Sequence, residues 1–200
     1  MRNLETPTFK VAVYGACSGL GNALLVSALQ RQYEVTALVD DLNALAARPG
    51  LRCKQGEPND AVAVSQSVAG MDAVICLLNE LYDAEHGDFS VQFRALLALL
   101  DGLEVAGVKR LLVVDDCTWL EQPETLIPVP AQHLQERLLA SPIAWTLVEA
   151  PAHAPRVTLE ACADGQAHTL PLLRFAAALL DEIKLSLHVH ERVRIAEGDS

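Results

Sequence analysis

The sequence is short of positive charge and of paired cysteines. Its 200 residues contain 15 Lys and Arg against 26 Asp and Glu, so the formal net charge is −11. Because a nucleic-acid backbone or an anionic membrane surface binds a basic face, we expect neither as a partner. The five cysteines are an odd number with no C-x-x-C pair among them. This arrangement predicts neither a disulfide framework nor a metal site, and it favours a reducing compartment.

Long hydrophobic runs are also missing. The longest apolar stretches, such as 95–100, fall far short of the roughly 18 residues that indicate a membrane-spanning helix. Residues 1–7 carry no apolar segment of the kind found in secretory leaders. We therefore expect a cytoplasmic protein. The hydrophobic fraction of 51% provides for a buried core, and a length of 200 residues suits a single domain.

What the sequence does contain is an alternation of short apolar runs with helical patterns. Strands are expected at 9–14, 34–39, 51–55, 73–78, 109–114 and 143–148. Helices are expected at 20–31, 42–47, 61–68, 89–105 and 131–139. In the last part, 156–161 and 185–195 alternate like strands on either side of a helix at 172–183. Apolar strands separated by helices predict a doubly wound α/β fold with a mainly parallel sheet.

A glycine-rich turn, Gly15-Ala16-Cys17-Ser18-Gly19-Leu20-Gly21, lies between the first strand and the first long helix. Glycines at this place let the backbone approach a pyrophosphate, and the helix amino terminus supplies unpaired N–H groups. The predicted cofactor contacts in the turn are Gly15, Cys17, Ser18, Gly19, Leu20 and Gly21. A tight turn without a ligand is the alternative. The position of Cys17 beside a helix amino terminus is one that can lower a thiol pKa.

Two aspartates follow the second strand. Asp40 stands 25 positions after Gly15, roughly the separation at which an acidic side chain binds the adenosine ribose of a dinucleotide. The same carboxylate repels a 2′-phosphate, and Asp41 adds a second negative charge. We therefore expect NAD(H) to be favoured over NADP(H). The alternative is that Asp40 and Asp41 cap the helix expected after them.

The turn resembles the G-A-S-S-G-I-G sequence of short-chain dehydrogenase/reductases, with Ser18 where related proteins often have glycine. Four further segments resemble the small, atypical NAD(P)H-binding members of that superfamily, the NmrA-like and flavin reductase/biliverdin reductase B-like group. They are Y-E-V-T-A-L-V at 33–39, V-A-G-M-D-A-V-I at 68–75, A-G-V-K-R at 106–110 and W-T-L-V at 145–148. The resemblance implies one NAD(P)-binding Rossmann domain over 1–200, with 151–200 as a small substrate-side extension. It also implies cofactor contacts at the ends of the third and fourth strands, by Glu57, Leu78 and Asn79.

The catalytic group is less evident. The resemblance suggests a Tyr-x-x-x-Lys pair, but the residues four places after the three tyrosines are Ser18, Ala37 and His86. In related reductases a histidine follows the sixth strand, which makes His153 the first candidate proton donor, with His133 as the second. No third ligand accompanies His188 and His190, so a metal site is not predicted.

The fifth strand is followed by acidic residues where related proteins have a Ser/Thr pair. Asp115 and Asp116 are expected beside the nicotinamide, with Asp116 as a cofactor contact, although they are equally suited to capping the loop. The sequence therefore favours an NAD(P)H-binding oxidoreductase that reduces a flavin or other small planar acceptor by hydride transfer. Two alternatives stay open, namely a dinucleotide sensor or regulator without catalysis, and a degenerate Rossmann domain. The oligomeric state is not predicted.

Overall fold

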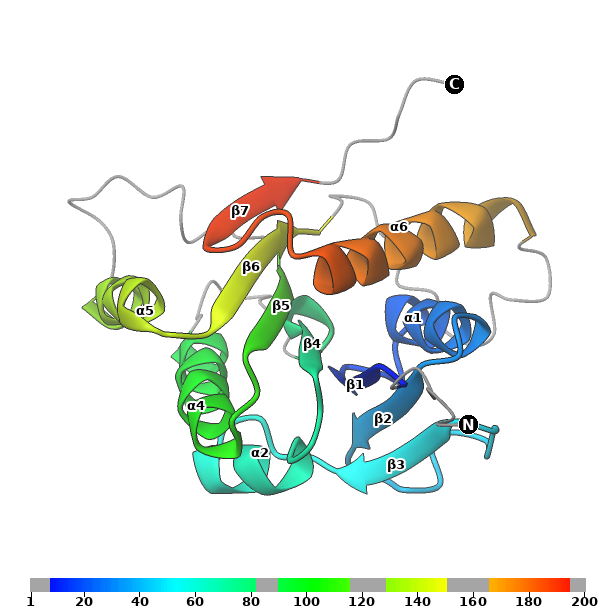
Figure 1. Ribbon diagram of the computed structural model, residues 1–200, viewed down its shortest axis with the longest axis horizontal. Coiled ribbons are helices and arrows are strands. Elements are labelled where there is room, and N and C mark those ends of the chain that lie inside the picture. The colour runs from blue at the N-terminus through cyan, green and yellow to red at the C-terminus, as the bar shows by residue number, and fades with distance from the viewer. Residues whose placement is uncertain (1–7, 82–89, 116–128, 151–165, 195–200) are drawn as a thin grey trace, which may run out of the picture.

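The computed structural model describes residues 8–81, 90–115, 129–150 and 166–194 (Figure 1). One sheet of seven strands forms its centre, with all strands parallel and in the order β3-β2-β1-β4-β5-β6-β7. The strands are β1 (Lys10–Tyr14), β2 (Glu34–Val39), β3 (Leu51–Gln55), β4 (Ala73–Leu77), β5 (Arg110–Asp115), β6 (Ala144–Glu149) and β7 (Glu191–Arg194). The order of the first six strands is that of the doubly wound Rossmann fold, which confirms the predicted fold class.

Helices cover both faces of the sheet (Figure 1). They are α1 (Gly19–Gln30), α2 (Ala61–Ser67), α3 (Leu78–Leu81), α4 (Ser90–Ala106), α5 (Val129–Ala140) and α6 (Gln166–Leu185). Helices α1 and α6 pack together on one face, whereas α2, α4 and α5 lie on the other. No helix in the described part of the chain is long and apolar enough to cross a membrane.

The two layers of helices explain why the central strands are almost wholly apolar. Every residue of β4 and β5 is buried. Successive residues of a strand point to opposite faces, so each strand contributes to both cores. On β5, Leu111 and Val113 pack in the core beside α4 and α5, and Leu112 and Val114 pack in the core beside α1 and α6.

Several expected elements differ from the structure. The helix expected over 42–47 is wrong, because turns and bends occupy this segment. Asn43 donates hydrogen bonds from its backbone N–H and its side-chain amide to Asp41 Oδ1, and these short-range bonds close a turn where a helix would need backbone pairing. The strand expected over 185–195 is reduced to β7, since Ser186 and His190 both adopt left-handed backbone conformations before it.

Most of the other boundaries shift by one or two residues. The fourth strand ends one residue earlier than expected, at Leu77, because the chain turns at once into α3. The helix expected over 172–183 is longer than expected and runs through the whole of α6. The strand expected over 156–161 lies outside the described residues.

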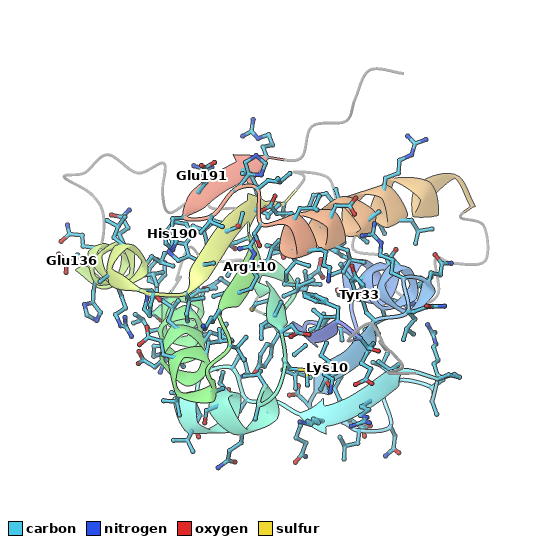
Figure 2. The ribbon with its side chains drawn as sticks, in the orientation of Figure 1. Lys10, Tyr33, Arg110, Glu136, His190 and Glu191 are labelled. Atoms are coloured by element: carbon cyan, nitrogen blue, oxygen red, sulfur yellow. The ribbon has the colours of Figure 1, made fainter. Side chains whose placement is uncertain are left out.

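A buried ion pair connects β5, α6 and the turn that leads to β7. Arg110 Nη2 lies 2.9 Å from Glu182 Oε1, and the two residues are only 6% and 8% exposed. Arg110 Nη1 also donates to the carbonyl of Ala144 at 2.7 Å, and His188 Nδ1 lies 2.8 Å from Glu182 Oε2. Figure 2 shows Arg110 in the interior, between β5 and α6. Glu182 therefore holds the start of β5, the end of α6 and the connection to the last strand together.

We expect Glu182→Leu to destabilise the protein by about 3–5 kcal/mol, because the Arg110 charge would remain buried without its carboxylate. Asp181→Leu is the matched control, since the neighbouring Asp181 makes an exposed ion pair with Arg31. Its loss is expected to cost at most about 1 kcal/mol. Urea denaturation measures both values, and equal costs for the two variants would contradict a structural role for the buried pair.

Candidate functional site

The functional edge of the sheet is the one at which its strands end. Because all seven strands are parallel, their carboxyl ends lie along one edge in the order β3, β2, β1, β4, β5, β6, β7. In open α/β sheets of this order, ligands bind outside the carboxyl ends where the strand order reverses, which here is between β1 and β4. The predicted site residues of the described chain are distributed along this edge, except for His133 on α5.

The glycine turn packs directly against the end of β4. Gly15 has a φ of +80°, and a Cβ atom placed on it would lie 2.9 Å from Leu77 Cβ and 3.6 Å from Glu80 Cβ. A Cβ atom on Gly21 would lie 2.2 Å from the carbonyl oxygen of Gly15. Neither position admits a side chain, so the turn can pack this closely on β4 and on the start of α1 only because both residues are glycine.

Ser18 is the N-cap of α1. Its Oγ accepts a hydrogen bond from Gly21 N at 2.9 Å and donates one to the Gly15 carbonyl at 2.9 Å. The residue that stands in place of a family glycine thus closes the turn and starts the helix. The first turn of α1 contains no acidic residue. The positive end of the helix dipole is therefore uncompensated by any side chain of that turn, which suits an anionic group such as a phosphate.

The remaining predicted contacts of the turn differ in exposure. Gly19 is the first residue of α1, and Leu20 is buried among the core residues beside α1 and α6. Leu20 therefore supports the turn by packing, and its predicted contact with a cofactor stays a prediction. Cys17 is exposed and reduced.

The electrostatic surroundings of Cys17 link the glycine turn to the ends of β2 and β3. Desolvation raises the pKa of its thiol, and Cys53, Asp40 and Asp41 raise it further. Its place beside a helix amino terminus thus does not lower the pKa, because partial burial and these acidic neighbours oppose thiolate formation. Cys17 is therefore close enough to the two aspartates to feel their charge.

Asp40 and Asp41 have different local roles. Both are exposed, but Asp41 Oδ1 accepts the two hydrogen bonds from Asn43 that close the turn after β2. Within the described residues, no hydrogen bond or ion pair engages Asp40. The alternative that Asp40 and Asp41 cap a helix is wrong, because no helix forms over 42–47. Of the two carboxylates, only that of Asp40 makes no hydrogen bond within the described residues.

The ends of β3 and β4 carry the next predicted contacts. Glu57 is exposed, and its Oε1 accepts hydrogen bonds from both N–H groups of Asn59, so it shapes the local turn. Leu78 is fully buried in the core beside α4. Asn79 Oδ1 is buried with no hydrogen-bond partner. Glu80, which the sequence analysis missed, lies next to Gly15, and its position just after the fourth strand was the available signal.

A buried carboxylate marks the end of β5. Asp115 is 4% exposed and shares its sheet face with Val113. Burial raises the pKa of the Cys76 thiol, and Asp115 raises it further, which places the two side chains near each other on the α4 side. The other predicted residues at this end, Asp116 and His153, lie outside the described residues. His133 is exposed on α5.

Farther along the same edge, β6 and β7 are joined by charge. Glu149 is hydrogen-bonded by Arg194 and lies 3.4 Å from Arg192. The hydrogen bond from Arg194 holds the pKa of Glu149 below its ordinary value. The Glu149 carboxylate therefore forms ion pairs that link β6 to β7. Among the described residues, no group of three or more His, Cys, Asp or Glu side chains is arranged to hold a metal ion.

A Rossmann sheet with a glycine turn, a capped helix amino terminus and an acidic residue after β2 defines an NAD(P)-binding protein. The comparison of sequences agrees, because residues 15–154 match the model of the NAD(P)H-binding family. The chain belongs to this family.

Solved structures share the fold over nearly the whole chain. A candidate epimerase from Bacteroides thetaiotaomicron is 23% identical, with a TM-score of 0.64 over 97% of this chain and 99% of that one. Bordetella bronchiseptica WbmH in complex with NAD⁺ is 14% identical, with a TM-score of 0.64 over 96% and 77%. A Veillonella parvula short-chain dehydrogenase/reductase in complex with NADP is 11% identical, with a TM-score of 0.63 over 96% and 95%. At these identities the likeness shows the fold alone.

Substitution at Gly15 tests the contact between the turn and β4. Gly15→Ala is expected to cost about 1–2 kcal/mol in left-handed strain and about 1–3 kcal/mol more from the collision with Leu77. Gly70→Ala is the matched control, since Gly70 has a φ of +77° and nothing within 4 Å of its added Cβ. It should show the strain alone. Equal losses in urea denaturation would mean that the turn does not pack tightly on β4.

Alkylation of Cys17 tests the electrostatic link to Asp40 and Asp41. Because its pKa is raised, less thiolate is present at a given pH, and the rate of reaction with iodoacetamide should rise at higher pH than for a free thiol. Asp40→Asn and Asp41→Asn should each lower the pKa and speed the reaction at pH 8. Peptide mass spectrometry measures the rate at Cys17. Asp181→Asn, far along α6, should have no effect, and a rate independent of Asp40 and Asp41 would contradict the placement.

Proposed function

We propose that the protein is an atypical short-chain reductase that binds NAD(H) in preference to NADP(H) and transfers hydride to a small acceptor such as a flavin. The observation that carries the proposal is the arrangement of the Gly15–Gly21 turn, which brings the amino terminus of α1, whose first turn has no acidic residue, to the edge of the sheet one strand from Asp40. The acceptor is a small molecule, and the proposed location is the cytoplasm.

The described residues suit a dinucleotide that runs along the edge from β2 to β5. The N–H groups at the start of α1 would hold the pyrophosphate, and Asp40 would accept hydrogen bonds from the adenosine ribose. Similar structures include complexes with NAD⁺ and with NADP, so the preference is argued from charge. The carboxylates of Asp40 and Asp41 would repel a 2′-phosphate, which favours NAD(H).

The nicotinamide would supply the hydride, and the protein would orient it and bind the acceptor. The chain lacks a Tyr-x-x-x-Lys pair, so proton transfer cannot follow the usual route of short-chain dehydrogenases. A flavin requires little help from a protein acid, which fits this absence. Where a proton must be supplied, His153 and His133 are the proposed donors.

A second candidate function is a dinucleotide sensor or regulator without turnover. The observation that favours it is Asp115, a buried carboxylate at the end of β5, where related reductases carry a hydroxyl-bearing pair. A carboxylate near the nicotinamide would stabilise the positive charge of its oxidised ring. Such a site would hold NAD⁺ without promoting reduction of an acceptor.

Cofactor oxidation tests the leading proposal. With FMN or riboflavin as the acceptor, NADH should be oxidised faster than NADPH when absorbance is followed at 340 nm. Asp40→Ser should reduce this preference by about 5- to 30-fold, since it removes one repulsive charge worth about 1–2 kcal/mol. Asp181→Ser is the control, because Asp181 lies near the end of α6, beside the residue that pairs with Arg110 at the amino edge of the sheet, and makes only an exposed ion pair with Arg31.

Binding measurements separate the remaining outcomes. Calorimetric binding of NAD⁺ and NADH without turnover on any flavin or quinone would remove the reductase and leave the sensor. Equal affinity for NAD⁺ and NADP⁺ in the unmodified protein would contradict the role given to Asp40. The absence of any dinucleotide binding would overturn the proposal in both forms and leave a degenerate Rossmann domain.

A further inference from the structure

Two buried amide oxygens at the functional edge have no hydrogen-bond partner. In the described part of the chain, three buried side-chain polar atoms lack one, namely Asn79 Oδ1, Gln92 Oε1 and Arg110 Nε. The Arg110 guanidinium makes several other hydrogen bonds, so the missing bond at its Nε costs little stability. A buried carbonyl oxygen without a donor is more costly, about 1–3 kcal/mol. Each such atom calls for a physical explanation, and a bound group that supplies the missing donor is one.

Both oxygens belong to the crossover between β4 and β5. Asn79 is the second residue after β4, in α3. Helix α4 connects the carboxyl end of β4 to the amino end of β5, so its first turn, which contains Gln92, lies at the edge where β4 ends. Asn79 lies just after β4, and Gln92 lies in the first turn of the helix that leads back to β5. Both amides are therefore expected near the carboxyl end of β4.

The direction of Gln92 is given by the helix that carries it. Gln92 is 3% exposed and precedes Leu96, Leu99 and Leu103 at helical spacing, and these leucines pack in the core below the sheet. Gln92 therefore continues the buried stripe of α4 at its amino-terminal end. Because Cα–Cβ bonds in a helix tilt toward its amino terminus, the Gln92 side chain leans toward the carboxyl edge of the sheet.

The strand order decides which part of a dinucleotide reaches this place. With its ribose at Asp40 on β2 and its pyrophosphate at the glycine turn after β1, an extended dinucleotide next crosses β4 and then β5. Neighbouring strands are about 4.8 Å apart, so the nicotinamide end would fall at the ends of β4 and β5. Asp115 ends β5 there, on the face that carries α4.

We propose that Asn79 Oδ1 and Gln92 Oε1 accept the two N–H groups of the nicotinamide carboxamide and so fix the orientation of the ring. The inference rests on the proposed binding of a dinucleotide. A carboxamide presents two donors on one nitrogen, and this edge presents two acceptors that lack donors. The two side chains would act as positioning residues, because they hold the ring and take no part in the hydride transfer itself.

A pair of dinucleotides that differ only in this group provides the test. In the 3-acetylpyridine analogue of NAD⁺, a methyl group replaces the NH₂ of the carboxamide, so the donors are lost and the carbonyl is kept. By calorimetry, NAD⁺ should bind at least about tenfold more tightly than the analogue, as expected for two hydrogen bonds. Gln92→Met should bring the two affinities to within about threefold of each other. Gln92→Glu, which keeps an acceptor, should retain the preference, and Gln30→Met, an exposed amide at the end of α1, should leave it unchanged.

The stability of the ligand-free protein gives an independent readout. Methionine fills the volume of Gln92 without an oxygen that needs a donor, so Gln92→Met should raise the melting temperature while it removes the preference for NAD⁺. A lower melting temperature would show that the chain itself satisfies Gln92, and it would overturn the inference.

ADP-ribose, which lacks the nicotinamide, distinguishes a failure of the carboxamide contact from a failure of dinucleotide binding. If ADP-ribose, NAD⁺ and the analogue all bind and the two dinucleotides bind equally, the proposed function stands and the role of Asn79 and Gln92 is refuted. If none of the three binds, both are refuted. Preference for NAD⁺ that survives in Gln92→Met refutes the role of Gln92 alone.

Discussion

The contact between the glycine turn and the end of β4 fixes the geometry of the functional edge. Gly15 lies so close to Leu77 that an added Cβ atom would stand 2.9 Å from the leucine Cβ. This close approach sets where α1 begins, just after the carboxyl end of β1. The strand order reverses beside it, because β1 pairs with β2 on one side and with β4 on the other. The close packing requires that Gly15 and Gly21 carry no side chain.

Charges along the edge alternate in the order that a dinucleotide presents them. Asp40 offers an acceptor at the end of β2, the start of α1 offers unpaired N–H groups and a positive dipole end, and Asp115 places a carboxylate at the end of β5. The corresponding parts of NAD⁺ are ribose hydroxyls, an anionic pyrophosphate and a cationic ring. The net charge of −11 thus says less about function than the position of two carboxylates, one on each side of a helix end whose first turn has no acidic residue.

The sequence predicts the sheet well because its strands are buried on both faces, so apolar runs such as that of β4 stand out. It predicts the helix over 42–47 wrongly because Asp41 and Asn43 pair locally, and an apolar pattern carries no information about such side-chain competition. The glycine turn was visible from its place between strand and helix, yet the capping role of Ser18 and the raised pKa of Cys17 depend on atoms brought together by the fold. Gln92 was a polar residue at the head of an apolar stripe, but only the packed structure reveals that its oxygen has no donor.

A stabilising ion pair and the proposed binding residues lie at opposite edges of the sheet. At the amino edge, Arg110 and Glu182 satisfy each other's charge and join β5, α6 and the turn before β7. At the carboxyl edge, two amide oxygens remain unpaired, at a cost of about 1–3 kcal/mol each. That sum is a large share of the roughly 5–15 kcal/mol by which a folded domain is stable. Replacing Gln92 with an apolar residue would remove its share of this cost, whereas the proposed carboxamide would offset the cost with the amide in place.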